Sequence, residues 1–103
     1  MSAHSRRPVS LTRRAQRDVA DILAYSLQQW GPEQELRHAE ALQRALALIG
    51  ENPLLGRARD DLRPGLRTYP IEPHLIFYEV RRNTVRVARI VHQRMDARRV
   101  LGG

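Results

Sequence analysis

The residues with the clearest chemical potential lie near the C-terminus, in the run His92-Gln93-Arg94-Met95-Asp96. An imidazole titrates near neutrality, so His92 can act as a general acid or base where it lines a cleft. Arg94 and Asp96 would complete a compact polar cluster, and Arg67, on the preceding predicted strand, could reach it to bind a phosphate or a carboxylate. The alternative is structural, with His92 and Asp96 pinning the tail to the sheet. The sequence offers this cluster no second proton-transfer group, which favours the structural interpretation.

The remaining carboxylates give no acid–base pair. Asp60 and Asp61 are adjacent in a predicted loop among arginines, where solvated ion pairs and turn chemistry are expected. Asp18 and Asp21 lie three apart on a predicted helix, beside arginines, and are expected on a solvated face. The sequence therefore predicts no catalytic residue.

Metal and cofactor chemistry is not indicated either. The sequence has no cysteine, and its four histidines include no pair four residues apart that would share one helix face. It also lacks a glycine-rich phosphate loop. We expect no metal and no cofactor. No apolar run approaches the roughly 18 residues of a membrane span, and no apolar segment follows the first arginines as in an export signal. A cytoplasmic protein with no membrane association is expected.

Two helices are predicted in the first half of the chain. Val9 and Leu11 alternate with polar residues, which indicates a short strand over 7–11. Apolar residues spaced three and four apart predict a helix over 13–30 that ends its core stripe at Trp30. A second stripe, beginning at Leu36, predicts a helix from about 33 to 49. Gly31 and the proline after it mark the turn of a helical hairpin.

The second half predicts a sheet. A loop over about 51–65 precedes strands over 66–71, 74–80 and 84–92, with a turn at 81–83, so an antiparallel three-stranded meander is expected. The predicted fold class is α+β: an N-terminal strand, a helical hairpin and the meander, with both helices packed on one face of the sheet. We expect a single domain over residues 1–103, with 1–6 and 97–103 flexible.

The middle predicted strand is apolar on both faces. Leu75 and Phe77 point to one side, and Ile76 and Tyr78 point to the other. The helical hairpin can cover only one of these faces. The other must be covered by the tail over 95–101, by a second copy of the chain or by a different protein.

The charge balance favours an acidic partner. The formal net charge is +7, with seven arginines and five acidic residues in 1–50 but eleven and six in 51–103. Five aromatic residues are too few for the stacking array of a general single-strand binder. The helical hairpin carries mixed charge where a recognition helix would be basic, so no sequence-specific DNA binding by the chain alone is expected.

Several short motifs resemble, in their order and spacing, those of ParE toxins of bacterial type II toxin–antitoxin systems, within the RelE/ParE superfamily. The resemblance spans nearly the whole chain and rests on Leu11-Thr12, Ala15, Asp18, Ile22, Tyr25, Trp30-Gly31, Asn52-Pro53, Gly56-Arg57, Gly65-Leu66-Arg67, His74-Leu75-Ile76-Phe77-Tyr78, Val87 to Ile90, His92, Arg94 and Asp96. It implies the strand, hairpin and meander order described above. It also implies a plasmid-stabilisation toxin that inhibits DNA gyrase by binding, and a ParD-like antitoxin whose C-terminal segment wraps the toxin in a hetero-oligomer.

The resemblance leaves one alternative, a ribosome-dependent mRNA endoribonuclease of the RelE kind. Such an enzyme needs basic residues at the developing phosphorane and an acid–base pair near the 2′-hydroxyl. Arg67 and His92 lie where RelE-like nucleases tend to carry functional groups. The tail over 98–103 lacks the terminal aromatic residue and the basic cluster common there. A binding inhibitor is therefore favoured over an enzyme.

Two residue sets follow as predictions. Contacts to the target, or structural polar roles, are expected of Arg67, His92, Arg94, Asp96 and Arg98. A place in the core or in the antitoxin groove is expected of Leu23, Leu42, Phe77 and Tyr78.

Overall fold

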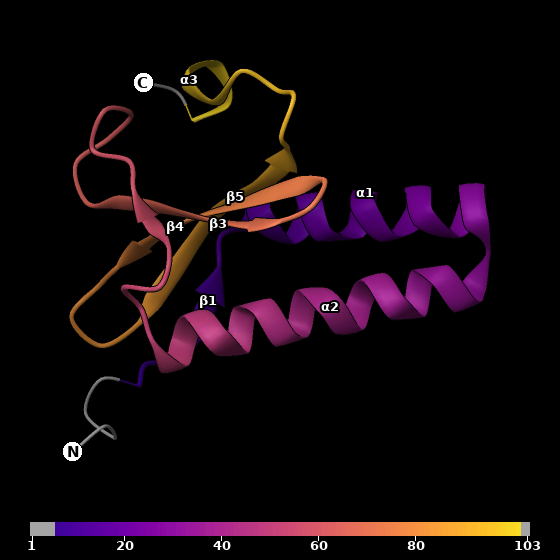
Figure 1. The fold of residues 1–103 in the computed structure, drawn as a ribbon, viewed down its shortest axis with the longest axis horizontal. Coiled ribbons are helices and arrows are strands. Elements are labelled where there is room, and N and C mark those ends of the chain that lie inside the picture. Colours follow the sequence, from indigo (N-terminus) through magenta and orange to yellow (C-terminus); the bar gives the residue numbers. More distant parts are fainter. Residues whose placement is uncertain (1–5, 102–103) are drawn as a thin grey trace.

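The computed structural model describes residues 6–101, which form a helical hairpin over a five-stranded sheet (Figure 1). In chain order, the elements are β1 (Val9–Leu11), α1 (Arg13–Trp30), α2 (Pro32–Glu51), β2 (Arg57–Ala58), β3 (Leu66–Ile71), β4 (His74–Val80), β5 (Val85–His92) and α3 (Ala97–Val100). The α+β class and the order of strand, hairpin and meander are confirmed.

The sheet has the order β1-β5-β4-β3-β2. Strands β3, β4 and β5 form the predicted antiparallel meander, and β1 adds to β5 in parallel, with Val9 opposite Val85. Strand β2 pairs with β3 inside the segment predicted as a loop. A two-residue exposed strand has no room for an alternating pattern, so the sequence carries no signal for it.

Local signals explain where the helices begin and turn. The Thr12 hydroxyl accepts the Ala15 N–H at 3.0 Å and so caps α1. Gly31 joins the helices with φ of +90°, a conformation that favours glycine. The tip of the hairpin extends past the sheet (Figure 1). Trp30 and Leu36 are accordingly 61% and 59% exposed, and their expected place in the core stripes is wrong because no sheet lies beneath them.

Side chains on the two faces of β4 belong to two separate hydrophobic cores, as the alternation of apolar residues along the strand predicts. The first core lies between the helices and the sheet and holds Ala15, Leu42, Ala45, Ile49, Ile76, Tyr78, Val85, Val87 and Ile90. The second lies on the opposite face and holds Leu66, Phe77, Val91 and Leu101. The tail, a second copy and a different protein were the three possible covers for this face, and in the structure the tail covers it. Ala97 and Val100 of α3 pack there with Leu101 and with Leu62 from the loop between β2 and β3.

The tail begins its helix at Asp96, whose carboxylate accepts the Arg98 N–H at 3.1 Å. The flexibility expected for residues 97–103 is a property of their motion, which a single structure does not test, so it stays a prediction. Residues 1–5 and 102–103 lie outside the described part of the chain. No helix within residues 6–101 is long and apolar enough to cross a membrane.

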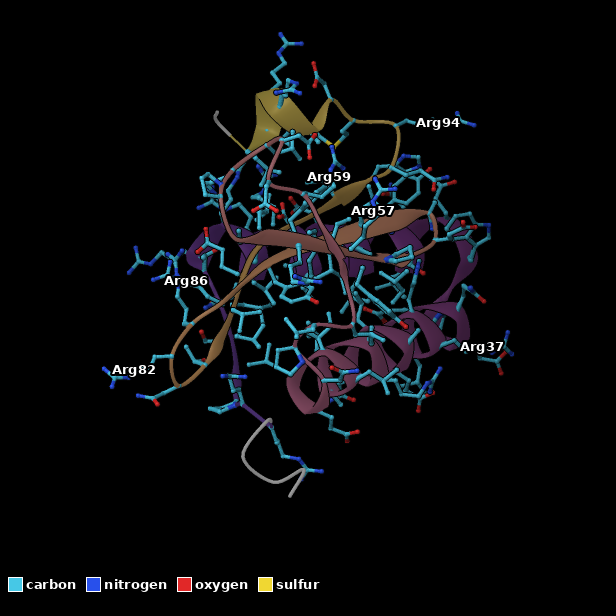
Figure 2. The ribbon with its side chains drawn as sticks, turned by 60° about the vertical axis from the view of Figure 1, so that its left-hand side comes forward. Arg37, Arg57, Arg59, Arg82, Arg86 and Arg94 are labelled. Atoms are coloured by element: carbon cyan, nitrogen blue, oxygen red, sulfur yellow. The ribbon has the colours of Figure 1, made fainter. Side chains whose placement is uncertain are left out.

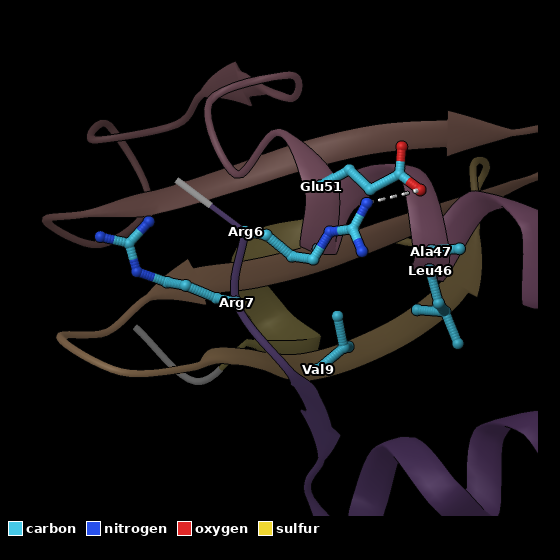
Figure 3. A pocket seen from close by; sticks show the side chains of 7 residues that line it. Arg6, Arg7, Val9, Leu46, Ala47 and Glu51 are labelled. Carbon is cyan, nitrogen blue, oxygen red and sulfur yellow. Dashed lines mark ion pairs between the residues drawn. The ribbon is translucent and has the colours of Figure 1, made fainter. Parts of the chain in front are cut away.

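The segment that precedes β1 is held against the C-terminal end of α2. The Arg7 N–H donates to the Gly50 carbonyl at 2.8 Å, and a Cβ at Gly50 would lie 2.8 Å from the Arg7 carbonyl oxygen. Only a residue without a side chain lets the two backbones come this close. Beside the contact lies a shallow depression, where the exposed side chains of Arg6 and Glu51 approach to 3.9 Å (Figure 3).

Candidate functional site

A groove of about 590 Å³ runs between α1 and the ends of β4 and β5. We call it the α1–β5 groove. Helix α1 contributes Ile22, Tyr25 and Trp30 to its lining, together with three charged residues, and three histidines line it from other elements. The residues used below are Ile22, Tyr25, Trp30, His38, His74, Ile90, His92 and Met95, together with the charged Arg14, Asp18, Asp21 and Arg89.

An aromatic pair forms one wall of the α1–β5 groove. The rings of Tyr25 and Trp30 meet edge to face, with centroids 5.8 Å apart, although 58% and 61% of the two residues are exposed. Met95, on the other side, is also exposed. Large aromatic side chains left open beside a groove are typical of interaction surfaces. The groove is therefore the candidate binding site on this face.

Three histidines from three elements meet in the α1–β5 groove. The ring centroid of His74 lies 6.1 Å from that of His38 on α2 and 5.7 Å from that of His92 on β5. His74 and His92 are direct partners in the antiparallel ladder. No two of these histidines lie at helical spacing in the sequence, so helical spacing alone does not group them. The useful signal was that the first residue of β4 pairs with the last residue of β5.

The geometry of the histidine cluster favours uncharged rings. His92 Nδ1 accepts the Arg94 N–H at 3.1 Å, which requires an unprotonated nitrogen there. Burial lowers the pKa of His74, and the neighbouring His92 and His38 lower it further. His38 Nδ1 is buried without a hydrogen-bond partner among the described residues. Within residues 6–101, no group of three or more histidine, cysteine or acidic residues has the geometry of a metal site.

The histidine cluster predicts a loss of stability in weak acid. In the unfolded chain His74 takes up its proton near pH 6.5, whereas the folded chain resists it to lower pH. Its contribution to stability is therefore fully present above about pH 6.5 and is lost as the pH falls from there toward the lower folded pKa. We expect urea unfolding to show a smaller drop between pH 7.5 and 5.5 for His74→Gln than for the unsubstituted chain. Equal drops in the two proteins would contradict this assignment.

A largely buried ion pair joins α1 to β5. Arg89 Nε and Nη2 donate to the Asp18 carboxylate at 2.8 and 3.1 Å, and each side chain is only 11% exposed. Asp18 also accepts the Ile90 N–H at 2.9 Å, while Arg89 Nη1 donates to the Val100 carbonyl at 3.2 Å. This Asp18–Arg89 clamp thus connects α1, β5 and α3.

The expected solvated position of Asp18 is therefore wrong. Strand β1 ends at Leu11, so the edge of β5 beyond Val87 has no strand partner. Helix α1 runs along this edge, and Asp18 satisfies the free N–H of Ile90. The spacing held a signal, since Asp18 lies three residues after the buried Ala15 and belongs to the same face.

Arg67 does not reach His92, contrary to the expectation. Its Nε donates to the Gly56 carbonyl at 2.8 Å, and its Nη2 donates to the Leu54 carbonyl at 3.3 Å. Arg67 pairs with Tyr78 at one end of β4, whereas His92 pairs with His74 at the other. Four residues of strand separate the two positions by roughly 13 Å. The guanidinium therefore holds a loop and is not part of the histidine cluster.

Tyr78 completes the anchoring of that loop. The Gly56 N–H donates to Tyr78 Oη at 2.8 Å, and Tyr78 Oη donates to the Pro53 carbonyl at 2.8 Å. Burial raises the pKa of Tyr78, so the hydroxyl keeps its proton. The segment after α2 is thus fixed by side chains from β3 and β4.

The other predicted site residues occupy distinct places. Arg94 is exposed, and Asp96 caps α3. Arg98 Nη1 donates to the Asp61 carbonyl at 3.3 Å. Asp61 also pairs with Arg59 at 2.9 Å, and hydrogen bonding to this guanidinium lowers the carboxyl pKa, as expected of an exposed ion pair.

The residues predicted for the core or the antitoxin groove lie mostly inside the protein. Leu42, Phe77 and Tyr78 are buried, and Leu23 packs half-buried against the first core. Their role in binding a partner stays a prediction. His38, His74 and Arg89 were not predicted as site residues. Each becomes recognisable only when the strand register and the helix positions are known.

Exposed arginines are spread over several faces. Figure 2 shows Arg82 and Arg86 near the β4–β5 turn, well away from Arg37 on α2 and from Arg94 in the tail. Arg57 lies on the edge strand β2. Within residues 6–101, these exposed arginines therefore lie on several faces and do not form one patch.

Comparison with known proteins adds the family context. A family profile described as "ParE toxin of type II toxin-antitoxin system, parDE" matches residues 9–97. The chain is 41% identical over 96 residues to Toxin ParE1 of Caulobacter vibrioides, covering 93% of this chain and 99% of the relative. It is 38% identical over 88 residues to Toxin ParE1 of Mycobacterium tuberculosis, covering 84% and 90%.

A solved structure shares the fold. A chain of the "Chromosomal ParDE TA system from P. aeruginosa" superposes with a TM-score of 0.73 at 23% identity, covering 86% of this chain and 97% of that one. The fold of this chain is therefore shared by a solved structure of low sequence identity.

Proposed function

Since the chain belongs to the ParE toxin family of type II toxin–antitoxin systems, we propose that it inhibits DNA gyrase by binding and that a ParD-like antitoxin neutralises it. The two proteins form a hetero-oligomer in the cytoplasm. The chain acts in this proposal as a binding inhibitor and not as an enzyme.

The open α1–β5 groove is the observation that supports an antitoxin partner. Tyr25, Trp30 and Met95 expose apolar surface around a groove of about 590 Å³. The chain around it has a net charge of +7. An amphipathic acidic segment fits this combination, because its apolar face fills the groove while its carboxylates meet the surrounding arginines.

The position of Arg67 supports target binding over RNA cleavage. A RelE-like nuclease needs a phosphate-binding cation near its proton-transfer groups. Here Arg67 binds the loop carbonyls of Gly56 and Leu54, about 13 Å along the strand from His92. Among the described residues, this arginine and this histidine do not form one site. The nuclease remains the alternative that the experiment must distinguish.

Supercoiling by purified gyrase tests the proposal. We expect the folded chain to abolish supercoiling of relaxed plasmid DNA and the ParD protein encoded with it to restore supercoiling. Exposed arginines are expected to contact the target, so Arg94→Ala with Arg98→Ala should weaken inhibition severalfold in a folded protein. Trp30→Ala should leave inhibition intact but raise the ParD concentration needed for rescue, since exposed tryptophans are common binding hot spots.

Two controls separate the possible outcomes. Leu54→Ala removes an exposed apolar side chain outside the α1–β5 groove and should behave like the unsubstituted chain. A parallel translation reaction monitors cleavage of messenger RNA. Intact supercoiling together with cleaved messenger RNA would replace the gyrase proposal by the RelE-like nuclease. Inhibition that ParD does not relieve would refute the antitoxin part alone.

A further inference from the structure

The histidine cluster lies in the surface that a partner would cover. His38, His74 and His92 line the α1–β5 groove together with the aromatic wall of Tyr25 and Trp30. The three rings come from α2, β4 and β5 and lie within about 6 Å of their neighbours. A segment seated in the groove therefore lies against all three imidazoles.

The surroundings of the cluster provide little compensation for a positive charge. The charged residues lining the groove are Arg14, Asp18 and Asp21 from α1 and Arg89 from β5. The carboxylate of Asp18 is already bound to Arg89 and to the Ile90 N–H. The remaining charged side chains in the lining are Arg14 and Asp21, which carry opposite formal charges. With uncharged imidazoles, the groove is electrically neutral and suits an apolar segment.

The surroundings of two ring nitrogens in the cluster disfavour their protonation. His92 Nδ1 accepts the Arg94 N–H, so protonation at this atom breaks that hydrogen bond. Among the described residues His38 Nδ1 is buried and has no hydrogen-bond partner, so a charged ring there lacks an acceptor. Protonation of His74 places its charge between the other two rings. Covering the groove removes the water that would stabilise any such charge.

We propose that docking in the α1–β5 groove is proton-linked: the apolar face of a partner segment covers the groove while His38, His74 and His92 are uncharged, and acidification weakens the complex. This inference rests on the proposed antitoxin partner and adds its regulation. Burial under an apolar surface disfavours a charged imidazole, so the complex binds fewer protons than the free chain. Affinity must then fall as the pH is lowered.

Calorimetry of the purified chain with the ParD protein encoded beside it tests the linkage. We expect the dissociation constant to rise severalfold between pH 8.0 and 5.5, and by less than about tenfold through His74, because the pKa of His74 in the free chain already lies below its ordinary value. At pH 5.5, titrations in buffers of different ionisation enthalpy should show protons released on binding. His74→Gln should release fewer protons and flatten the pH dependence.

A matched control and a second measurement guard against indirect effects. Tyr25→Phe changes the same groove without removing an imidazole and should keep the full pH dependence. If His74→Gln does not fold, NMR titration of the unsubstituted chain decides, because the pKa of His74 must be lower in the complex than in the free chain. An unchanged value, or tight binding that is independent of pH, would overturn the proton linkage and leave the antitoxin partner standing. No binding at any pH would overturn both.

Discussion

Asp18→Asn is expected to lower the free energy of unfolding by about 3–5 kcal/mol, the usual cost of removing one partner of a buried ion pair. The substitution leaves the guanidinium of Arg89 at 11% exposure without its carboxylate. It also weakens the acceptor that satisfies the Ile90 N–H. Because Arg89 also binds the Val100 carbonyl, loosening of the C-terminal helix should accompany the loss.

Urea denaturation followed by circular dichroism measures this effect. Asp21→Asn, three residues along the same helix at an exposed position, is the matched control and should change stability by less than about 0.5 kcal/mol. Adding Arg89→Met to Asp18→Asn should recover part of the loss, since it removes the unpaired charge. Similar effects of Asp18→Asn and Asp21→Asn would contradict the clamp.

Gly56→Ala is expected to cost about 3 kcal/mol through crowding at a buried contact. A Cβ at this position would lie 2.6 Å from Tyr78 Oη and 2.8 Å from the Thr68 carbonyl oxygen. Neither atom can move freely. Tyr78 Oη is hydrogen-bonded to the Gly56 N–H and the Pro53 carbonyl, and Thr68 is part of strand β3. Relief of the clash therefore breaks hydrogen bonds that anchor the loop.

Tyr78→Phe separates the two contributions. Alone, it removes the hydroxyl and should cost about 1–3 kcal/mol by leaving the Gly56 N–H and the Pro53 carbonyl without this partner. Combined with Gly56→Ala, it also removes the closest clash, so the double variant should lose less stability than the sum of the single variants. Additive losses in thermal or urea denaturation would show that the clash and the hydrogen bonds are independent.

The fold was predictable because its signals are periodic and local. The stripes of α1 and α2, the turn at Gly31 and the two-sided alternation of Ile76 and Phe77 each have a direct physical meaning. Each was confirmed in its main feature. The errors arose where tertiary context decides. Trp30 continues a helical stripe, but the sheet ends before it, and periodicity contains no information about where a neighbouring element stops.

The candidate site was less predictable because its parts are distant in sequence. His38, His74 and His92 become neighbours only through the pairing of β4 with β5 and the position of α2 above them. Asp18 and Arg89 meet across 71 positions. The chemistry of the imidazole identified His92, but the prediction wrongly placed Arg67 beside it. The error arose because the two residues pair with opposite ends of β4, which only the strand register shows.

The parallel pairing of β1 with β5 has a consequence for the order in which the chain acquires its structure. Val9, near the start, aligns with Val85, so the first strand has no sheet partner until the last strand has been synthesised. Translation proceeds at roughly 5–20 residues per second, which leaves the N-terminal strand unpaired for several seconds on the ribosome. Contacts this distant in sequence also slow folding, because a long loop must close first. The complete groove, whose lining extends to Met95, therefore exists only after this residue has emerged from the ribosome, and a partner that recognises the groove encounters the assembled sheet.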